Sequence, residues 1–417
     1  MPKKNTKYTF IDLFAGAGGL SEGFMQAGFL PIAHVEMDKD ACETIKTRTA
    51  YHYLKGKRNF KFYIDYLKGD ITRKVLYDKL PPKLLETVIN VKLSDKTIKS
   101  VFDSINISLK AIKKRTIDII VGGPPCQAYS LAVRKKPKPG RKKIDERKYL
   151  YKLYGKFLKK YKPKVFVFEN VPGIYTSDNG KYYRNMKKYF KRLGYEMDDK
   201  TLDAADFGVV QRRKRVIVIG WKKTLKNFKY PEFKKIENKW KVKHIFSDLP
   251  ILKPGDDLKI GRYTKQAANK YLSSFEIRNG INFVTQNIVR PLNDKDSKIY
   301  KYAVKKINRN KILKYSELPE EMRTIKNTVD FTDRFKVVVK GNLSHTMIAH
   351  IAKDGHHYIH PDLKQLRSIS VREAARIQSF SDDFFFEGSR TSIFRQIGNA
   401  VPPLMSKNIA KNIKVRI

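Results

Sequence analysis

The sequence predicts an α/β protein that combines a mostly parallel sheet with a smaller, irregular unit. Helical stretches such as residues 148–160 separate short runs of β-branched and aromatic residues, which are typical of strands buried on both faces. After Trp221 this alternation ends, and residues 222–345 are polar and rich in lysine. The runs expected to form strands are residues 8–15, 30–37, 117–123, 164–168 and 215–221.

The composition favours a folded protein with a polyanionic partner. Of the 417 residues, 41% are hydrophobic and 12% aromatic, which is enough for a large and a small domain with separate cores. Lysine and arginine total 88 against 41 acidic residues, and the net charge of +47 favours nucleic acid as the partner. Part of this excess follows from a general abundance of Lys, Ile, Asn and Tyr, of the kind that AT-rich genomes produce.

Two cysteines, Cys42 and Cys126, are too few for a disulfide framework and fit a reducing compartment. Asp12 and the glycines after it interrupt the first apolar stretch, so we expect no signal peptide. We also expect no membrane span, because no run approaches 18 apolar residues.

A glycine-rich turn after the first expected strand is a candidate ligand site. Phe14 leads into Gly16 and Gly18, where the missing side chains let the backbone turn tightly and approach a ligand. The G-x-G-G spacing differs from the G-x-G-x-x-G of dinucleotide sites, and a tight turn without a ligand is the alternative. Glu36 closes the next strand, where a carboxylate can accept hydrogen bonds from ribose hydroxyls. Asp70, in a Gly-Asp-Ile tripeptide, is a weaker candidate for contact with an adenine amino group.

The loop that contains Cys126 is the strongest chemical signal. Two glycines and two prolines, residues 122–125, lie between an expected strand and this cysteine. The prolines stiffen the loop and hold the cysteine at the carboxyl edge of the sheet, where α/β sites assemble. A thiolate there can act as a nucleophile. The alternative, a buried structural cysteine, better describes Cys42, which lies in a helical context.

Polar residues also flank two other expected strands. Glu169 should face the same rim as Cys126, and in a dry pocket its carboxyl group can stay protonated and donate to a ring nitrogen. Arg213 precedes the expected strand 215–221 and Arg215 begins it, and because alternate residues project to one side, both can point inward toward a base carbonyl and a phosphate. An ordinary strand-end acid and a solvated basic edge are the alternatives.

These segments together resemble the cytosine-5 DNA methyltransferases of restriction–modification systems. Ala128-Tyr129 and Val210 depart from the commonest pattern, which has Gly-Phe and Pro there. The matching segments occur in the family's usual order between residues 8 and 403: DLFAGAGGLSEGF, Glu36, GDI, GGPPCQAYS, FENVPG, QRRKRVIVIG, REAARIQSF and RQIGNAVPP.

The resemblance implies a Rossmann-like, class I S-adenosylmethionine-dependent methyltransferase domain and a smaller target-recognition domain. The first would comprise residues 1–221 and 392–417, with the C-terminal helix beside the first strand, and the second residues 222–391. Cys126 would attack carbon 6 of a cytosine flipped out of duplex DNA, and carbon 5 would receive the methyl group.

The resemblance also assigns the other site residues. Glu169 would bind N3 and the exocyclic amino group of the cytosine, Arg215 would hold the O2 carbonyl, and Arg213 would support the loop. The cofactor contacts that it implies are Phe14, Gly16, Gly18, Glu36, Asp70, Leu150, Asn399 and Val401.

The implied partner is double-stranded DNA, bound by a monomer in the bacterial cytoplasm, and a cognate restriction endonuclease would act separately on the same site. The basic run 134–143 is expected to contact phosphates, so that the affinity for DNA falls steeply with salt.

Three alternatives to this function are an RNA (tRNA) cytosine-5 methyltransferase, a non-catalytic DNA-binding relative and a nicotinamide oxidoreductase. The long segment between Trp221 and Arg367 argues against the first, because a DNA enzyme needs such a region to read base edges.

Three further segments carry expectations. Five histidines within 345–360 lie on a predicted hairpin around Asp354-Gly355, where we expect them to face DNA or solvent. A metal site is the alternative, but no cysteine or well-spaced acid completes one. Ser370 and Glu373 predict a capping box that begins a helix. Residues 72–115 are expected to form helical decoration at the edge of the sheet.

Overall fold

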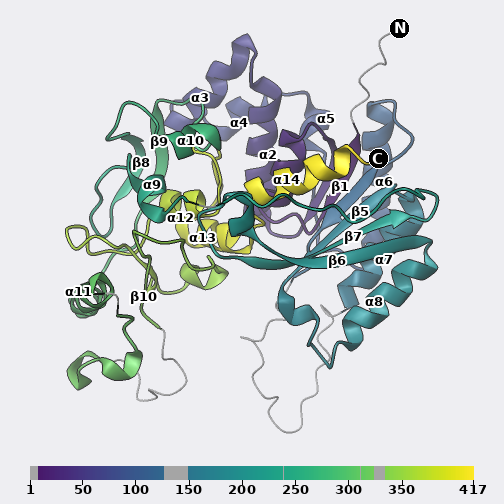
Figure 1. Ribbon diagram of the computed structural model, residues 1–417. Helices are drawn as coiled ribbons and strands as arrows, with labels where there is room; N and C mark the ends of the chain where they lie inside the picture. The colour runs from purple at the N-terminus through teal and green to yellow at the C-terminus, as the bar shows by residue number, and fades with distance from the viewer. Residues whose placement is uncertain (1–7, 126–148, 238, 310, 324–333) are drawn as a thin grey trace.

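The computed structural model describes residues 8–125, 149–237, 239–309, 311–323 and 334–417 (Figure 1). Its main feature is a seven-stranded sheet with the order β3-β2-β1-β4-β5-β7-β6. The strands from β3 to β5 are mutually parallel, and β7 runs antiparallel to both β5 and β6. The predicted α/β class with a mostly parallel sheet is therefore confirmed. The strand bounds are β1 Thr9–Leu13, β2 Leu30–Glu36, β3 Val88–Asn90, β4 Ile119–Gly122, β5 Val165–Asn170, β6 Tyr195–Asp203 and β7 Lys214–Lys222.

Helices cover both faces of the sheet, which explains why its central strands are continuously apolar. On one face, Phe10 of β1 packs in a cluster with residues of α1 (Gly19–Gln26) and α14 (Pro403–Lys414), so the C-terminal helix lies beside the first strand as expected. On the other face, the next residue, Ile11, packs in a cluster with residues of three further helices. These are α6 (Ile98–Ala111), α7 (Leu150–Tyr161) and α8 (Lys181–Arg192).

The segment between β2 and α6 adds a helical layer and one strand. The expectation of helical decoration at 72–115 is correct for its helices but missed β3, a three-residue strand at the sheet's edge. The helices of this layer are α2 Lys39–Leu54, α3 Lys61–Lys68, α4 Arg73–Tyr77 and α5 Pro82–Leu85, with a 3₁₀ turn at Arg58–Phe60.

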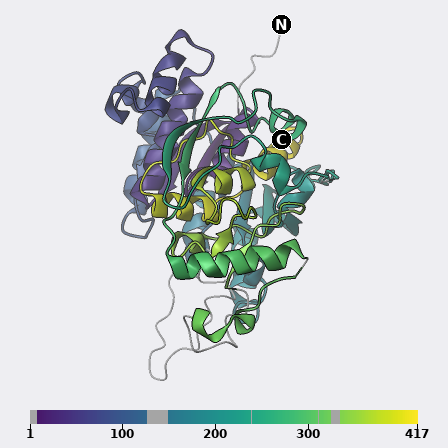
Figure 2. The same cartoon turned by 90° about the vertical axis from the view of Figure 1, so that its left-hand side faces the viewer.

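Most of the chain between β7 and α14 forms the second unit, seen at the left of Figure 1 and facing the viewer in Figure 2. Its two small sheets pair β8 with β9 antiparallel and β10 with β11 parallel. The capping box at Ser370 and Glu373 is confirmed at the start of α12. The regular elements are α9 Val242–Phe246, β8 Asp257–Arg262, α10 Lys270–Ser274, β9 Phe283–Ile288, α11 Asp294–Asn308, β10 Lys336–Val337, β11 His357–Ile359, α12 Val371–Ile377 and α13 Arg390–Asn399, with 3₁₀ turns at Tyr315–Glu317, Glu320–Met322 and Ala349–Ala352.

The predicted hairpin around Asp354-Gly355 is wrong. β11 pairs with β10, and the segment before the turn bonds to the chain leading into β7 instead. Ser344 N donates to Val210 O at 3.1 Å, and Met347 N donates to Gln211 Oε1 at 2.7 Å. These donors are therefore not available to form a ladder with residues 357–359.

Packing also bears on where the second unit ends. Ile393 and Ile397 of α13 belong to the same core cluster as α12, whereas α14 packs on the large sheet. A boundary at 391/392 falls inside α13, and the division of the chain into two domains stays a prediction. Within the described residues, no helix is long and apolar enough to cross a membrane.

Candidate active site

The glycine turn follows β1 directly and curls through three left-handed residues. Phe14, Gly16 and Gly18 have φ angles of 60°, 54° and 78°. Gly19 then begins α1, and a Cβ atom there would lie 2.4 Å from the backbone oxygen of Val401. Glycine is therefore required for this close approach, which brings Val401 from the far end of the chain to the turn.

Glu36, at the end of the neighbouring strand β2, holds this turn in place. Its Oε2 accepts a hydrogen bond from Gly16 N at 2.8 Å, and its Oε1 accepts from Met37 N at 2.7 Å and Asp38 N at 2.8 Å. The backbone thus orients the carboxylate, and its remaining lone pairs can accept hydrogen bonds from the hydroxyl groups of a ligand. These acceptor oxygens fit the hydroxyl groups of the ribose in a nucleoside-containing cofactor.

The other expected cofactor residues lie at element ends. Leu150 opens α7 and packs, with Phe14, at the margin of the same core cluster. Asn399 is the last residue of α13, is exposed, and precedes Val401 by two positions.

Asp70 is not brought to the carboxyl edge of the sheet. It follows the end of α3, where its backbone N donates to Asp65 O at 2.9 Å, and its side chain is exposed. The strand that pairs with β2 is β3, which comes after Asp70 in the chain and ends at Asn90. In this pairing Asn90 lies opposite Glu36. The Nδ2 of Asn90 donates to Glu36 O at 3.2 Å. The sequence did not indicate this position, because three residues are too few for a strand pattern.

Met37 is a second position that the sequence did not indicate. Its side chain is 60% exposed directly after Glu36. A large apolar group left in solvent beside a ligand site is suited to cover an aromatic ring.

The base of the cysteine loop lies between β1 and β5, although Cys126 itself and the basic run 134–143 fall outside the described residues. A Cβ atom on Gly122 would lie 2.4 Å from Leu13 O, and one on Gly123 would lie 2.4 Å from Glu169 Oε2. The Nδ2 of Asn170 donates to Pro124 O at 3.2 Å. The two glycines therefore let the loop that leads to Cys126 start directly against Glu169.

Glu169 and Arg215 form an ion pair at this point. Arg215 Nε lies 2.9 Å from Glu169 Oε1, and the two side chains are only 12% and 13% exposed. Burial raises the pKa of Glu169, although the cations of Arg215 and Arg213 act in the opposite direction. The carboxyl group therefore holds a proton to higher pH than an ordinary glutamate does.

Arg213 has a different position from the one expected. It is fully buried, and its guanidinium donates to the backbone oxygens of Met347 and Gly398. The expectation that both arginines point toward a base and a phosphate is wrong for Arg213, because β7 begins only at Lys214 and strand alternation does not extend back to it. The arrangement matches its other expected role, supporting the loop.

A cleft of about 540 Å³ opens beside Arg215. Both units contribute to its walls, and three of the side chains that line it are cationic. It is therefore suited to an anionic group. The lining residues are Pro172, Asp203, Arg212, Lys214, Arg215 and Thr346.

Comparison with known proteins shows the family. The profile of the C-5 cytosine-specific DNA methylase family matches residues 8–62 and 59–415. The chain is 44% identical to the type II methyltransferase M.Bpa9945I of Bacillus paralicheniformis, over 97% of this chain and 98% of that protein. This chain belongs to the C-5 cytosine-specific DNA methylase family. It is thus a DNA cytosine-5 methyltransferase, and the resemblance seen in the sequence is confirmed.

Other relatives agree with this assignment. The type II methyltransferase M1.HphI of Haemophilus parahaemolyticus is 30% identical over 97% of this chain and 86% of its own length. A solved DNA modification methyltransferase encoded within a prophage (E. coli) has the same fold, with a TM-score of 0.65, 23% identity and coverage of 98% of this chain and 99% of its own. The family depends on S-adenosylmethionine and acts in restriction–modification.

Two of the five histidines between residues 345 and 360 of this methyltransferase differ from expectation. His356 and His360 are buried, with 7% and 5% exposure, so they do not face solvent or DNA. His360 stacks on Phe246, and burial lowers its pKa to about 4. Among the described residues, no group of three or more histidine, cysteine or carboxylate side chains is placed to hold a metal ion.

Proposed function

We propose that this enzyme methylates carbon 5 of a cytosine within a specific sequence of double-stranded DNA, by flipping the base out of the helix and forming a transient bond between Cys126 and carbon 6. The observation that carries the proposal is the buried pair of Glu169 and Arg215 at the root of the Cys126 loop. A base has to leave the stack to reach such a site.

The chemistry requires both a nucleophile and a proton. Carbon 5 of cytosine is a poor nucleophile, and addition of the Cys126 thiolate to carbon 6 makes it electron-rich. Glu169 would donate a proton or a hydrogen bond to N3 as negative charge develops there, and its raised pKa supports this role. Carbon 5 would then take the methyl group from the sulfonium sulfur of S-adenosylmethionine, which leaves as S-adenosylhomocysteine. Loss of the proton that carbon 5 still carries, to water acting as base, would restore the double bond and expel the thiolate.

Arg215 would hold the O2 oxygen of the flipped cytosine. Its guanidinium is already fixed by Glu169 and has further donors. Arg213 would act as a positioning residue, since it is fully buried and its guanidinium donates to the backbone oxygens of Met347 and Gly398.

The cofactor would lie at the glycine turn. S-adenosylmethionine, when bound, supplies an electrophilic methyl group. Glu36 would accept hydrogen bonds from its ribose hydroxyls, while the backbone at Gly16 and Gly18 leaves room for close approach and Met37 covers the adenine ring. Phe14, Leu150, Asn399 and Val401 complete the set that we propose.

Residues 222–391 would select the target by reading base edges, with DNA lying between the two units. We further propose that the enzyme acts as a monomer in the bacterial cytoplasm and protects DNA from a cognate restriction endonuclease.

Expression in a host without cytosine methylation, followed by genome-wide mapping of 5-methylcytosine, tests the reaction and yields the target sequence. A 5-fluorocytosine placed at that target should trap a covalent complex, because carbon 5 then has no proton to lose. Cys126→Ala should abolish both methylation and trapping while leaving binding of S-adenosylmethionine almost unchanged. Methylation by this variant at the normal rate would exclude the mechanism.

A further inference from the structure

The helix α8 presents a continuous row of cations to solvent. Its buried face consists of Tyr183, Met186 and Phe190, which pack against the sheet. On the opposite, exposed face, five of the residues are basic, and the twelve-residue helix contains no acid. The five cations are Lys181, Arg184, Lys188, Lys191 and Arg192.

These cations are not neutralised within the described part of the chain. None of the five forms an ion pair there, whereas Lys187, on the side of the same helix, pairs with Asp199 at 3.1 Å. Lys188, Lys191 and Arg192 instead line a surface hollow of about 420 Å³.

Helix stability accounts for only part of the row. Lys191 and Arg192 lie in the last turn, where the helix dipole favours cations. Lys181 and Arg184 lie in the first turn, where the dipole disfavours them, and neighbours along the row that are three or four residues apart repel one another. A local structural role therefore does not explain the row as a whole, but an external polyanion would.

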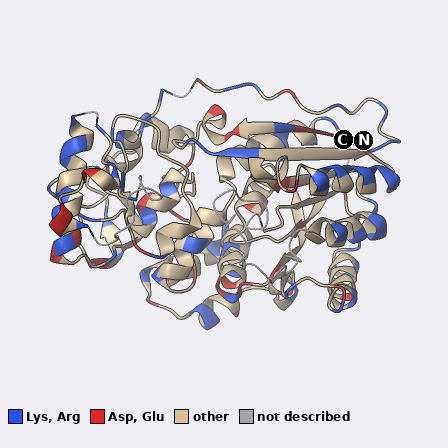
Figure 3. Cartoon of the chain, turned by 90° about the horizontal axis from the view of Figure 1, so that it is seen from below, with Lys and Arg blue, Asp and Glu red and all other residues tan. Residues whose placement is uncertain are grey.

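The row begins close to the proposed active site. Eight residues separate Pro172, which lines the cleft beside Arg215, from Lys181. From there α8 extends along the lower edge of the molecule, away from the second unit (Figure 1). Lys and Arg are prominent on the helices at the right-hand end of Figure 3, which views this side.

We propose that α8 binds the phosphates of duplex DNA that flanks the target sequence. This rests on the proposed function, and it extends the DNA-binding surface beyond the cleft and the target-reading unit. The helix is about 18 Å long, so its row of cations can follow duplex DNA, which carries one charge per about 1.7 Å.

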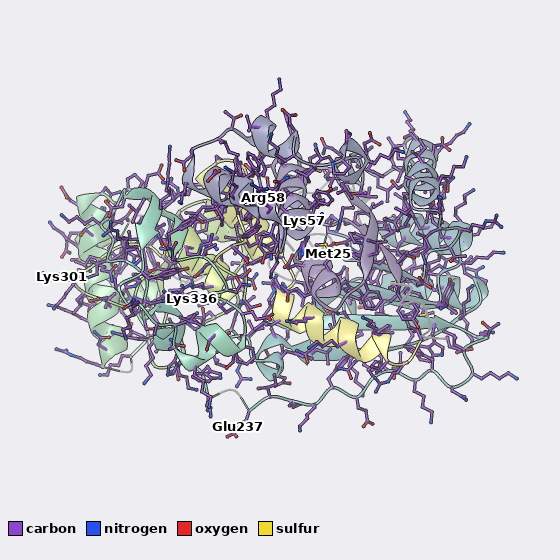
Figure 4. All side chains as sticks on the ribbon, turned by 90° about the horizontal axis from the view of Figure 1, so that it is seen from above. Met25, Lys57, Arg58, Glu237, Lys301 and Lys336 are labelled. Atoms are coloured by element: carbon purple, nitrogen blue, oxygen red, sulfur yellow. The ribbon has the colours of Figure 1, made fainter. Side chains whose placement is uncertain are left out.

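The test compares two charge-matched triple variants. In the first, Lys188, Lys191 and Arg192 are changed to Gln. In the control, Lys55, Lys57 and Arg58 are changed to Gln; these exposed residues lie on the opposite side of the molecule, where Figure 4 shows Lys57 and Arg58 from above. Both variants lose two lysines and one arginine, so their net charges are equal.

Each protein is assayed on two duplexes that share the mapped target, one of about one helical turn and one of about four turns. Wild type and control should bind the long duplex about tenfold or more tightly than the short one at low salt, and the α8 variant should lose this preference. For the α8 variant on the long duplex, the slope of the logarithm of the binding constant against the logarithm of the salt concentration should become shallower by about 2 to 3. Its turnover on the short duplex should equal that of wild type.

An α8 variant that keeps the control's length preference and salt slope would overturn the inference. The inference would also be overturned if the α8 variant bound long duplex RNA more weakly than wild type did but bound long duplex DNA equally well. That result would assign the surface to RNA. If wild type methylates neither duplex, the proposed function fails, which is distinct from both of these results.

Discussion

At the scale of single residues, Glu169 has opposing influences on its carboxyl group. Burial raises its pKa, while Arg215 at 2.9 Å and the nearby Arg213 favour the charged form. The net shift of the pKa is upward, so the group takes up a proton at higher pH than an ordinary glutamate does. The protonated form is the one that the proposed contact with cytosine N3 requires.

Replacing Glu169 with Gln tests this proton. An amide can donate a hydrogen bond to N3 but cannot transfer a proton, so we expect the rate of methylation in a single turnover to fall about 10²- to 10⁴-fold. Binding of DNA should change much less. The wild-type rate should fall as pH rises through the raised pKa of Glu169, and the variant should lack that fall. The exposed Glu86→Gln is the control, and an unchanged rate in Glu169→Gln would remove Glu169 from the chemistry.

Asp12 is a second residue whose burial has a measurable consequence. It lies beneath the glycine turn, where Ser21 Oγ donates to its carboxyl group and also contacts His34 Nδ1 at 3.0 Å. Burial raises the pKa of Asp12 from 3.8 to about 7, against a smaller lowering by Ser21. The folded state therefore keeps a proton that the unfolded chain releases.

The stability supplied by this proton is complete below pH 3.8 and is lost as pH rises to about 7. Asp12→Asn is neutral at every pH, so its free energy of unfolding should rise relative to wild type between pH 4 and pH 8, by at most about 4 kcal/mol. Urea unfolding at several pH values measures the difference. Because His34 is present in both proteins, its own titration, with a pKa lowered by burial to about 4, largely cancels. If the free energies of unfolding of wild type and Asp12→Asn changed in parallel with pH, the prediction would be contradicted.

At the scale of secondary-structure elements, the packing of α1 on α14 depends on one glycine. A Cβ atom on Gly23 would lie 2.3 Å from Lys407 N and 2.4 Å from the Ser406 side chain. Backbone atoms cannot move aside as a flexible side chain can. The two helices therefore approach closely only because position 23 has no side chain.

Gly23→Ala should lower the free energy of unfolding by about 1–3 kcal/mol through this overpacking, even though alanine favours an isolated helix by about 1 kcal/mol. Gly341→Ala is the control, since a Cβ atom there meets no atom within 4 Å. Urea unfolding distinguishes the two. A stabilised Gly23→Ala protein would show that helix propensity outweighs the contact.

The elements also show which strands a sequence can predict. β4 and β5 are buried on both faces, and their apolar runs are visible in the sequence. β6 is an edge strand of mixed polar character, and β3 has three residues, so neither has such a run. Residues 344–347 pair with the chain before β7, and these two segments lie more than 130 residues apart in the sequence. The turn signal at Asp354-Gly355 is local, so it predicted a hairpin and could not indicate this distant pairing.

At the scale of the whole molecule, a buried ion cluster links the first unit to the segment after α12. Arg48 of α2 contacts Glu22 Oε1 at 2.7 Å and Asp383 Oδ1 at 3.0 Å, and it is 3% exposed. These three residues come from segments that are far apart in the sequence. If Arg48 were removed, Glu22 and Asp383 would stay buried but would both lose their ion pair with its guanidinium.

Arg48→Met should therefore lower the free energy of unfolding by about 3–5 kcal/mol. Lys46→Met removes a more exposed pair with Glu43 and should cost at most about 1 kcal/mol. The midpoints of urea unfolding of the two variants provide the measurement. Equal midpoints would show that the cluster does not hold the units together.

The sequence by itself determined the fold class, the family and the order of the site segments, because buried parallel strands, glycine turns and strand-end polar residues are local patterns. It located Glu36, Glu169 and Arg215 correctly at the ends of their strands. Only the tertiary structure decided that Arg213 is buried, that Asn90 rather than Asp70 ends the strand beside β2, and that a row of cations on α8 has no ion-pair partner among the residues that the structure describes. The physical reason is that burial, pairing and neutralisation of a side chain are set by residues distant in the chain, whose approach no local pattern specifies.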